Sequence, residues 1–599
     1  MLFSTYEKRV DLVRTLSCDV LVVGGGTGGT AAALRATAMG RAVVLTEATR
    51  WLGGQLTAQG VSALDEHAFI EEFGGTAAYQ QLRAGIREWY RRSGALKSDA
   101  ERLNPGNGWV SRLCFEPRVG VAVIDEMVQP AVESGLLTVL YGLVPVAVMR
   151  TGDRVDAVML RDVNTGAETE VRAAVTIDAT ELGDLLPLAG VPYRTGMEAF
   201  RETGEPSAPA VGEPEAVQSF TFPFAVEFCP GESHVIPKPE GYERFRDSQP
   251  FGFDGYRMFR PGGPVGLPFW TYRRLVDASL FGADRYPRDI AMINWPGNDY
   301  YGANLIDKPA AEQARILAEA KRLSLSFLHW LQTEAPRDDG GHGYPELRLR
   351  ADVMGTEDGL SQYPYIRESR RIRALCTVRE QDIVVDYNPG ARAQLHPDSV
   401  GLGLYIFVDV HRCANCQETP GAGQKMRPFQ IPMGALLSPD VSNLIAGGKN
   451  LGVTHITNGA FRLHPTEWNV GESAGALAAF ATAQGISPHQ VHHGEELTRQ
   501  FQQALLEQGV PLYWFTDVPW GHAAFEAVQY LAVTGIVGGA ADSLLFRPEE
   551  PVAADEAAQW CQAAGRVAGA TAVLRLGPAE TRVAFARRLY EVIRSHVQS

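Results

Sequence analysis

The chain has 599 residues, the composition of a large globular protein and an excess of negative charge. Hydrophobic residues make up 45% and charged residues 21%, which supports buried cores and argues against disorder. Lys and Arg total 55 against 70 Asp and Glu, so the net charge of −15 disfavours nucleic acid and anionic membranes as partners. No apolar run approaches the roughly 20 residues of a membrane span, and the N-terminal segment lacks a signal-peptide pattern. We therefore expect several domains and a cytoplasmic location.

The seven cysteines are odd in number and mostly isolated, which argues against a secreted disulfide framework. We expect most of them to be buried thiols. Cys413 and Cys416 alone are closely spaced, and we interpret them as structural or incidental thiols. Their spacing also fits a redox dithiol or half of a metal site. No second such pair follows in the sequence, so we predict no metal.

Residues 18–47 predict a strand, a helix and a second strand in succession. Residues 20–23 are wholly apolar and β-branched, as a central parallel strand requires. Residues 30–39 are Ala-rich with helical character, and residues 42–45 again favour a strand. The segment is therefore predicted to be a βαβ unit.

A glycine motif, Gly24-x-Gly26-x-x-Gly29, lies between the first strand and the helix. Gly24 allows a tight turn, Gly26 lets the backbone approach a pyrophosphate, and Gly29 permits close packing of helix on strand. Glu47, at the end of the second strand, can accept hydrogen bonds from the ribose hydroxyls of an adenosine. Together these residues predict a dinucleotide-binding site.

The rest of the chain divides by composition. Residues 136–178 predict strands joined by hairpins, ending in a buried strand at 175–178. Residues 190–375 are richer in Pro, Gly and aromatics, with one long helix predicted at 310–331, and suggest an inserted substrate domain. Apolar strands then return, followed by a small-residue helix predicted at 471–480.

The segment beyond residue 490 is predicted to be mostly helical. Within it, residues 517–522, the apolar stretch that follows and residues 546–548 resemble a single S-layer-homology repeat. Such repeats usually occur in sets on exported proteins, so we favour a helical packing module over a wall anchor.

Seven further segments carry a resemblance to a known family. A small-residue segment, residues 48–57, follows Glu47 and is similar to the loop under the diphosphate in FAD-dependent oxidoreductases of the glutathione-reductase structural class. More narrowly, the chain resembles the FAD_oxidored family of FAD-dependent oxidoreductases. The matching segments are residues 177–184, with Glu181 where the family usually has Gly, and residues 365–371, 409–411, 431–432, 443–450 and 471–475.

The resemblance implies FAD as the cofactor and an α/β fold. We expect a Rossmann-like FAD-binding domain with an inserted α+β substrate domain and a helical C-terminal module. The predicted boundaries are 1–190 and 396–489 for the two parts of the FAD-binding domain, 191–395 for the insertion and 490–599 for the C-terminal module. No second glycine fingerprint follows a strand, so a separate nicotinamide domain is not expected.

The predicted cofactor contacts combine the glycine motif with residues implied by the resemblance. In that structural class a late helix points its N-terminus at the flavin, where its dipole stabilises the reduced anion. We place Gly471 at that position, although a helix packing tightly through small residues is the alternative. The full predicted set is Gly24, Gly26, Thr27, Gly28, Gly29, Glu47, Ala48, Arg50, Gly53, Gly54, Gln55, Thr57, Ala179, Thr180, Gly447, Asn450, Gly471, Glu472 and Ser473.

Polar residues before that helix are the candidates for catalysis. His464 or His455 could remove a hydroxyl proton as hydride leaves the adjacent carbon, and Arg462 could fix an anion or a developing alkoxide. The alternative for each histidine is a hydrogen bond to a loop carbonyl. His411, after an apolar strand, is a weaker candidate. Substrate could also contact Asn298, Tyr300, Tyr301, Arg367 and Arg371, although an arginine pair is often an exposed ion-pair face.

The sequence thus predicts an FAD-dependent oxidoreductase that moves hydride between a polar small-molecule substrate and the flavin, with an electron acceptor that it does not identify. Two alternatives remain: a tRNA-modifying flavoprotein, since similar FAD domains occur in such enzymes, and a surface- or polysaccharide-associated binding protein. The acidic composition disfavours the first alternative.

Overall fold

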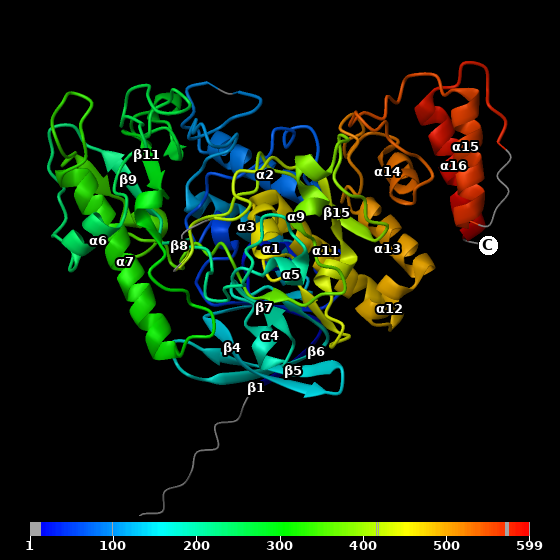
Figure 1. The fold of residues 1–599 in the computed structure, drawn as a ribbon, viewed down its shortest axis with the longest axis horizontal. Helices are drawn as coiled ribbons and strands as arrows, with labels where there is room; N and C mark the ends of the chain where they lie inside the picture. Colours follow the sequence, from blue (N-terminus) through cyan, green and yellow to red (C-terminus); the bar gives the residue numbers. More distant parts are fainter. Residues whose placement is uncertain (1–13, 99, 415, 417–418, 569–573, 598–599) are drawn as a thin grey trace, which may run out of the picture.

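A seven-stranded sheet forms the base of the protein in the computed structural model, which describes residues 14–597 except 99, 415, 417–418 and 569–573 (Figure 1). The strand order is β3-β2-β1-β6-β5-β4, and β17 pairs with the end of β6. Five strands are mutually parallel: β1 (Arg14–Val23), β2 (Val43–Glu47), β3 (Leu137–Tyr141), β6 (Glu168–Asp178) and β17 (Leu444–Ala446). Two complete an antiparallel meander with β6: β4 (Leu143–Thr151) and β5 (Arg154–Asp162).

The predicted βαβ unit is confirmed by β1, α1 (Thr27–Ala38) and β2. Val20 to Val23 are fully buried because β1 is paired on both sides, with β2 and with β6. The helix begins at Thr27, within the glycine motif, rather than at residue 30. Its first turn therefore lies directly at the carboxyl end of β1, where parallel strands of this fold bind their ligands.

A long buried helix, α11 (His464–Gln484), packs across α1. A Cβ atom at Gly471 would lie 1.9 Å from the Gly28 carbonyl oxygen, and one at Gly475 would lie 2.2 Å from that of Ala32. The prediction that this helix begins at residue 471 is wrong: it begins at His464, with Pro465 in its first turn, a position that proline favours. The small residues mark a helix–helix crossing in the middle of α11 and not its N-terminus.

The inserted part of the chain has a second hydrophobic core (Figure 1, left). A four-stranded antiparallel sheet, in the order β10-β11-β9-β13, packs with the 24-residue helix α7 (Ala310–Thr333), which confirms the helix predicted at residues 310–331. The two-stranded pair of β7 and β14 joins the start and the return of the insertion. The elements are β7 (Tyr193–Arg194), β8 (Phe220–Thr221), β9 (Phe224–Phe228), α6 (Tyr242–Ser248), β10 (Arg274–Val276), β11 (Ile290–Ile293), β12 (Asp299–Tyr300), β13 (Leu347–Leu349) and β14 (Arg371–Ile372).

Helices cover the remaining surface, and the C-terminal part is helical as predicted (Figure 1, right). Before β15 these helices are α2 (Ala77–Arg92), α3 (Pro117–Glu133), α4 (Leu185–Leu188), α5 (Phe200–Thr203), α8 (Ala351–Met354) and α9 (Glu380–Ile383). The pair β15 (Ser399–Gly403) and β16 (Phe429–Pro432) and the helix α10 (His455–Phe461) precede α11. The C-terminal helices are α12 (Pro488–His493), α13 (Glu495–Glu507), α14 (Phe525–Val533), α15 (Ala554–Ala568) and α16 (Arg582–Val597). Among the described residues, none of the helices has both the length and the apolarity of a membrane span.

The α1–α11 crossing predicts a specific loss of stability. Gly471→Ala places a methyl group against the Gly28 backbone, so we expect a destabilisation of about 1–3 kcal/mol, measured by urea unfolding. Gly538→Ala is the matched control, because an added Cβ there meets no atom within 4 Å. Equal stability of the two variants would contradict the close contact.

Candidate functional site

A pocket opens where the carboxyl ends of β1, β2 and β6 meet the first turn of α1. Gly24 has a φ of +99°, and an added Cβ would lie 2.3 Å from the Ala179 carbonyl oxygen, so this turn requires glycine. A Cβ at Gly29 would lie 1.8 Å from the Gly24 oxygen, which keeps the helix close to the loop. The N-terminus of α1 therefore presents its amide groups to the pocket, an arrangement that favours an anion.

Glu47 lies in this pocket at the end of β2. Its Oε2 accepts a hydrogen bond of 2.9 Å from the Gly25 amide, and its Oε1 accepts one of 2.7 Å from the Thr49 amide. Burial raises the pKa of Glu47 to about 7, more than these hydrogen bonds lower it. The carboxylate is thus fixed beside the glycine loop and gains a proton near neutral pH.

Seven of the residues predicted to bind cofactor line this pocket, and the others support it from behind or lie elsewhere. Arg50 donates a hydrogen bond to the Gly355 carbonyl, Thr27 donates to the Gly53 carbonyl, and Asn450 donates to the Asp178 carbonyl. The pocket residues are Gly24, Gly26, Glu47, Ala48, Gly54, Ala179 and Thr180. The residues outside its lining are Thr27, Gly28, Gly29, Arg50, Gly53, Gln55, Thr57, Gly447, Asn450, Gly471, Glu472 and Ser473.

The three residues placed at the flavin through the late helix make protein contacts instead. Gly471 packs on Gly28, Glu472 forms a buried ion pair with Arg35, and the Ser473 hydroxyl donates to the Val400 carbonyl at 2.6 Å. Because α11 begins before them, none of the three lies at a helix N-terminus. That position belongs to residues 464–467.

Part of the pocket wall was not anticipated from the sequence. Leu143, Val144 and Pro145 at the start of β4, together with Gln59 and Tyr363, also line the pocket. Their local sequence pattern indicates only a strand and loops. The three residues of β4 reach the pocket because β4 lies near β2 in the folded sheet.

A buried ionic cluster lies next to the glycine loop. Lys449 Nζ is 2.7 Å from Glu181 and 2.9 Å from Glu467, and Gln55 donates to Glu467 at 2.5 Å. Burial lowers the pKa of Lys449, but the two carboxylates outweigh burial and raise it, so the ammonium stays charged. A Cβ on Gly26 would lie 2.4 Å from Glu181 Oε1. The Glu181 carboxylate therefore lies over the glycine that the motif assigns to a pyrophosphate.

A second polar network lies around Arg462, between the sheet domain and the insertion. Arg462 donates to Asp409 at 2.7 Å, and its carbonyl accepts a hydrogen bond of 3.0 Å from Gln55. His411 Nε2 is 3.3 Å from Asp409, and its Nδ1 is 3.2 Å from Asp299. Arg367 is the last member of the network and donates a hydrogen bond of 2.8 Å to Asp299. Residues from five separate segments of the chain thus meet in one network.

Charge balance keeps the two carboxylates of this network ionised. Burial raises the pKa of Asp299, but Arg367 and His411 outweigh it and hold that pKa well below the usual range. Asp409 has the same balance, with His411 and Arg462 lowering its pKa. The His411 side chain is 28% exposed, which makes it the most accessible member of the Asp299–His411–Asp409 group.

The two histidines first predicted for catalysis are buried. His464 Nδ1 accepts the Asp65 amide at 3.0 Å, and its Nε2 donates to the Val61 carbonyl at 2.9 Å, so both ring nitrogens are engaged. Burial lowers the pKa of His464 to about 4. His455 Nδ1 is 2.9 Å from Glu368, and burial lowers its pKa to about 3. For His464 the contacts correspond to the loop-carbonyl alternative.

The candidates in the insertion have separate positions. Arg371 is fully buried and paired with Glu368 and Glu198, and is not on an exposed face. Asn298 accepts the Trp295 amide at 2.8 Å within a short turn, and the Tyr300 hydroxyl donates to Glu319 at 3.2 Å. The ring of Tyr301 lies 5.8 Å from the Arg412 guanidinium. Of the five, only Arg367 joins the network around His411.

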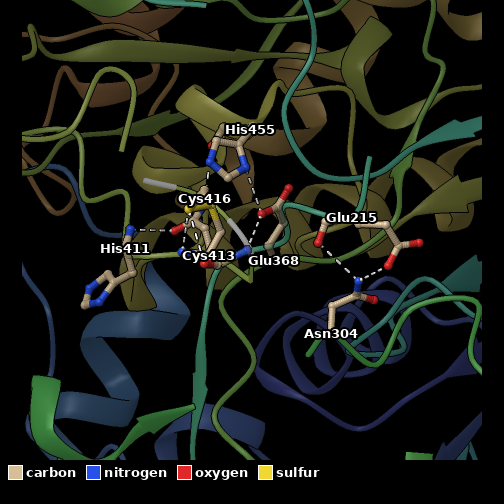
Figure 2. Close-up of a disulfide and its surroundings, with 8 residues drawn as sticks. Glu215, Asn304, Glu368, His411, Cys413, Cys416 and His455 are labelled. Atoms are coloured by element: carbon tan, nitrogen blue, oxygen red, sulfur yellow. Dashed lines mark hydrogen bonds and ion pairs between the residues drawn. A yellow bond between two sulfur atoms is a disulfide. The ribbon is translucent and has the colours of Figure 1, made fainter. Parts of the chain in front are cut away.

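Cys413 and Cys416 form a disulfide, which corrects the expectation that they are thiols (Figure 2). Their Cα atoms are 5.4 Å apart, within the range that a disulfide spans. The other five cysteines are free, and two of them, Cys114 and Cys229, are fully buried.

The parallel sheet, the glycine turn at the N-terminus of α1 and the Glu47 carboxylate at the end of β2 define a Rossmann-like fold of the flavoprotein type. The family model for FAD dependent oxidoreductases matches residues 19–505. The chain belongs to this family, and its cofactor is FAD.

Solved structures with similar chains are distant. A geranylgeranyl bacteriochlorophyll reductase-like protein from Thermoplasma acidophilum is 10% identical, with 93% of this chain and 98% of that chain covered and a TM-score of 0.32. The p-nitrophenol 4-monooxygenase from Pseudomonas putida is 13% identical, with 61% of this chain and 71% of that chain covered and a TM-score of 0.26. The L-proline dehydrogenase from P. horikoshii is 16% identical, with 33% of this chain covered and a TM-score of 0.17. The match covers 28% of that chain, which is less than a third of that protein. No curated protein matches the chain.

The pocket fits the adenosine-diphosphate half of FAD. Glu47 can bind the ribose hydroxyls, and the first turn of α1 can bind the diphosphate. Gln55 Oε1 and Thr466 Oγ1, both buried and without a hydrogen-bond partner among the described residues, offer polar atoms beyond the glycine loop. Glu181, next to Gly26, carries a charge that opposes the diphosphate, and Lys449 compensates it.

Removal of the Glu181 charge should strengthen cofactor binding. In Glu181→Gln the repulsion is lost and Lys449 can pair with the diphosphate, so we expect FAD to bind about three- to tenfold more tightly. Titration of the apoprotein with FAD, followed by flavin fluorescence, measures this change. Glu168→Gln, on an exposed stretch of β6, is the control for net charge. Weaker binding in Glu181→Gln would show that the carboxylate assists the cofactor.

FAD affinity should also depend on pH through Glu47. Its carboxylate accepts hydrogen bonds from ribose, and its pKa of about 7 means that the acceptor is lost as the pH falls below neutrality. We expect the dissociation constant to rise as the pH is lowered from 8 to 6, by up to about tenfold per unit below the pKa. Glu47→Gln should bind weakly with a flat pH profile. A wild-type profile as flat as that of the variant would exclude Glu47 as the ribose ligand.

Proposed function

We propose that the protein uses FAD to oxidise a small hydroxylated substrate, or to reduce the corresponding carbonyl compound, beside Arg462, Asp409 and His411. The observation that supports this is the Gln55 side chain, which links the segment after β2, next to the glycine loop, to the Arg462 carbonyl. The polar network thus begins where the cofactor site ends. FAD, when bound, supplies the two-electron redox chemistry.

The charges of the network favour a polar substrate over a strongly anionic one. Arg462 pairs with Asp409, Arg367 with Asp299, and Arg273 with Asp65, at 2.7 to 3.0 Å. These pairs cancel, so no excess positive charge remains to bind several phosphates or carboxylates. The guanidinium Nε atoms of all three arginines are buried and lack a partner among the described residues. They are donors for the oxygens of a hydroxylated compound.

His411 is the group best suited to move the substrate proton. It lies between two ionised carboxylates, and its side chain remains partly accessible. In the oxidising direction the substrate hydroxyl replaces the 3.3 Å contact between His411 Nε2 and Asp409, and this nitrogen accepts the hydroxyl proton. Asp299, which remains at Nδ1, stabilises the resulting positive charge. Arg462, with its second contact to the Tyr365 hydroxyl at 2.7 Å, orients the substrate oxygen. Arg462 is retained from the sequence prediction, while His411 replaces His464 and His455 as the acid–base group.

An anaerobic substrate screen tests this proposal. Sugars, polyols, hydroxy acids and amines are mixed with the FAD-loaded protein, and a substrate bleaches the flavin absorption band. With a substrate found, His411→Gln should slow flavin reduction by about 10²–10⁴-fold, the usual contribution of an acid–base group, while FAD affinity is unchanged.

The exposed His342 provides the control, because His342→Gln changes a histidine outside the network. Equal rates for His411→Gln and His342→Gln would remove the role of His411. A flavin that no hydroxylated compound reduces, and whose reduced form no carbonyl compound reoxidises, would contradict the proposed reaction.

A further inference from the structure

The Cys413–Cys416 disulfide lies on the same segment as Asp409 and His411. Cys413 is buried, at 2% exposure, whereas Cys416 is partly exposed. Of the two sulfurs, Cys416 Sγ is therefore the one more open to a reactant. A disulfide stabilises a fold mainly by closing a long loop in the unfolded chain, and this one joins residues only three apart in sequence. A stabilising role explains little of its presence.

Gln218 connects the disulfide to the substrate-side network. Its backbone forms a bridge with Cys413, and its amide N–H donates to Glu368 at 2.8 Å. Its side chain accepts the His411 amide at 3.0 Å and donates to the His455 carbonyl at 3.4 Å. Gln218 thus contacts the segment of the disulfide, the proposed acid–base histidine His411 and a second histidine, His455. Figure 2 shows the two histidines and the disulfide together.

His455, which Gln218 connects to the disulfide segment, offers an unused acceptor. Its Nδ1 is bound to Glu368, and its Nε2 is buried without a hydrogen-bond partner among the described residues. In the view of Figure 2 this second nitrogen is on the side of the disulfide. Since the Glu368 carboxylate accepts a proton from Nδ1, Nε2 carries a free lone pair. A cysteine thiol formed by reduction can donate to it. The Cys413 amide also donates to Cys416 Sγ at 3.0 Å, which stabilises negative charge on that sulfur.

We propose that Cys413–Cys416 is a redox-active disulfide, a second two-electron centre that connects the FAD to a disulfide compound in solution. The proposal rests on the proposed function, because it names the class of electron acceptor for the same site. The sulfur–sulfur bond of the protein breaks, and its two sulfurs take two electrons and two protons from reduced FAD, which returns to the oxidised form. The Cys416 thiolate then attacks the external disulfide, and Cys413 resolves the mixed disulfide. The external compound leaves with its sulfur–sulfur bond reduced to two thiol groups, and the protein disulfide forms again.

An anaerobic reductive titration of the FAD-loaded full chain counts the redox centres. Per bound FAD, we expect wild type to take up about four electrons, and the double variant Cys413→Ser/Cys416→Ser about two, since flavin and disulfide are each two-electron couples. Cys376→Ser is the matched control, a partly buried free cysteine, and should retain about four. Alkylation of the reduced wild type, followed by peptide mass spectrometry, should label Cys413 and Cys416 only after the titration.

Counting per bound FAD keeps the comparison valid if a variant loads less cofactor. Uptake of about two electrons by wild type, with Cys413 and Cys416 protected from alkylation until the chain is unfolded, would overturn the proposal. That outcome differs from failure of the proposed function, in which the flavin is reduced by the titrant but reacts with no hydroxylated or carbonyl substrate. Oxidation of the four-electron form by a small linear disulfide such as 2-hydroxyethyl disulfide, absent in the double variant, supports the assigned acceptor class.

Discussion

The site depends on the close contact of α1 with the later part of the chain at Gly28. A Cβ atom there would lie 2.0 Å from the Gly447 carbonyl oxygen, and Gly471 of α11 packs on the Gly28 backbone. The first turn of α1 is thereby held between β17 and α11. This contact brings Lys449 and Glu467 next to the glycine loop and places Arg462, just before α11, within reach of Gln55. Without it the two parts of the FAD-binding domain would not form one site.

The charges divide the site into regions with different tasks. At the glycine loop, the α1 N-terminus and Lys449 favour the diphosphate, and Glu181 opposes it. Around His411, paired arginines and aspartates cancel, which leaves directional donors without net charge. In the proposed reaction, strong electrostatics would hold the cofactor, while hydrogen-bond geometry would select the substrate. The inserted domain supplies Arg367 and Asp299 and so contributes to this selection.

Features set by neighbours in sequence could be predicted, and those set by tertiary contacts could not. Gly24, Gly29 and Glu47 were predicted because their tasks follow from a strand, a turn and a helix in succession. The start of α11 was missed, because the run of small residues at 471–475 reflects a crossing with α1 and resembles a helix N-terminus only in composition. The proximity of β4 to Glu47 and the approach of Asp299 to His411 have no local signal, since they join segments far apart in the chain. The spacing of Cys413 and Cys416 was visible, but spacing does not encode an oxidation state.

The structure of the protein with bound FAD is the most direct test of how the site is built. The diphosphate should lie on the first turn of α1 beside Gly24 and Gly26, the ribose on Glu47, and the flavin ring beside Arg462 and His411. A flavin ring bound away from the Arg462–Asp409–His411 network would contradict the proposed reaction site. A diphosphate bound anywhere other than the glycine loop would contradict the assignment of the pocket.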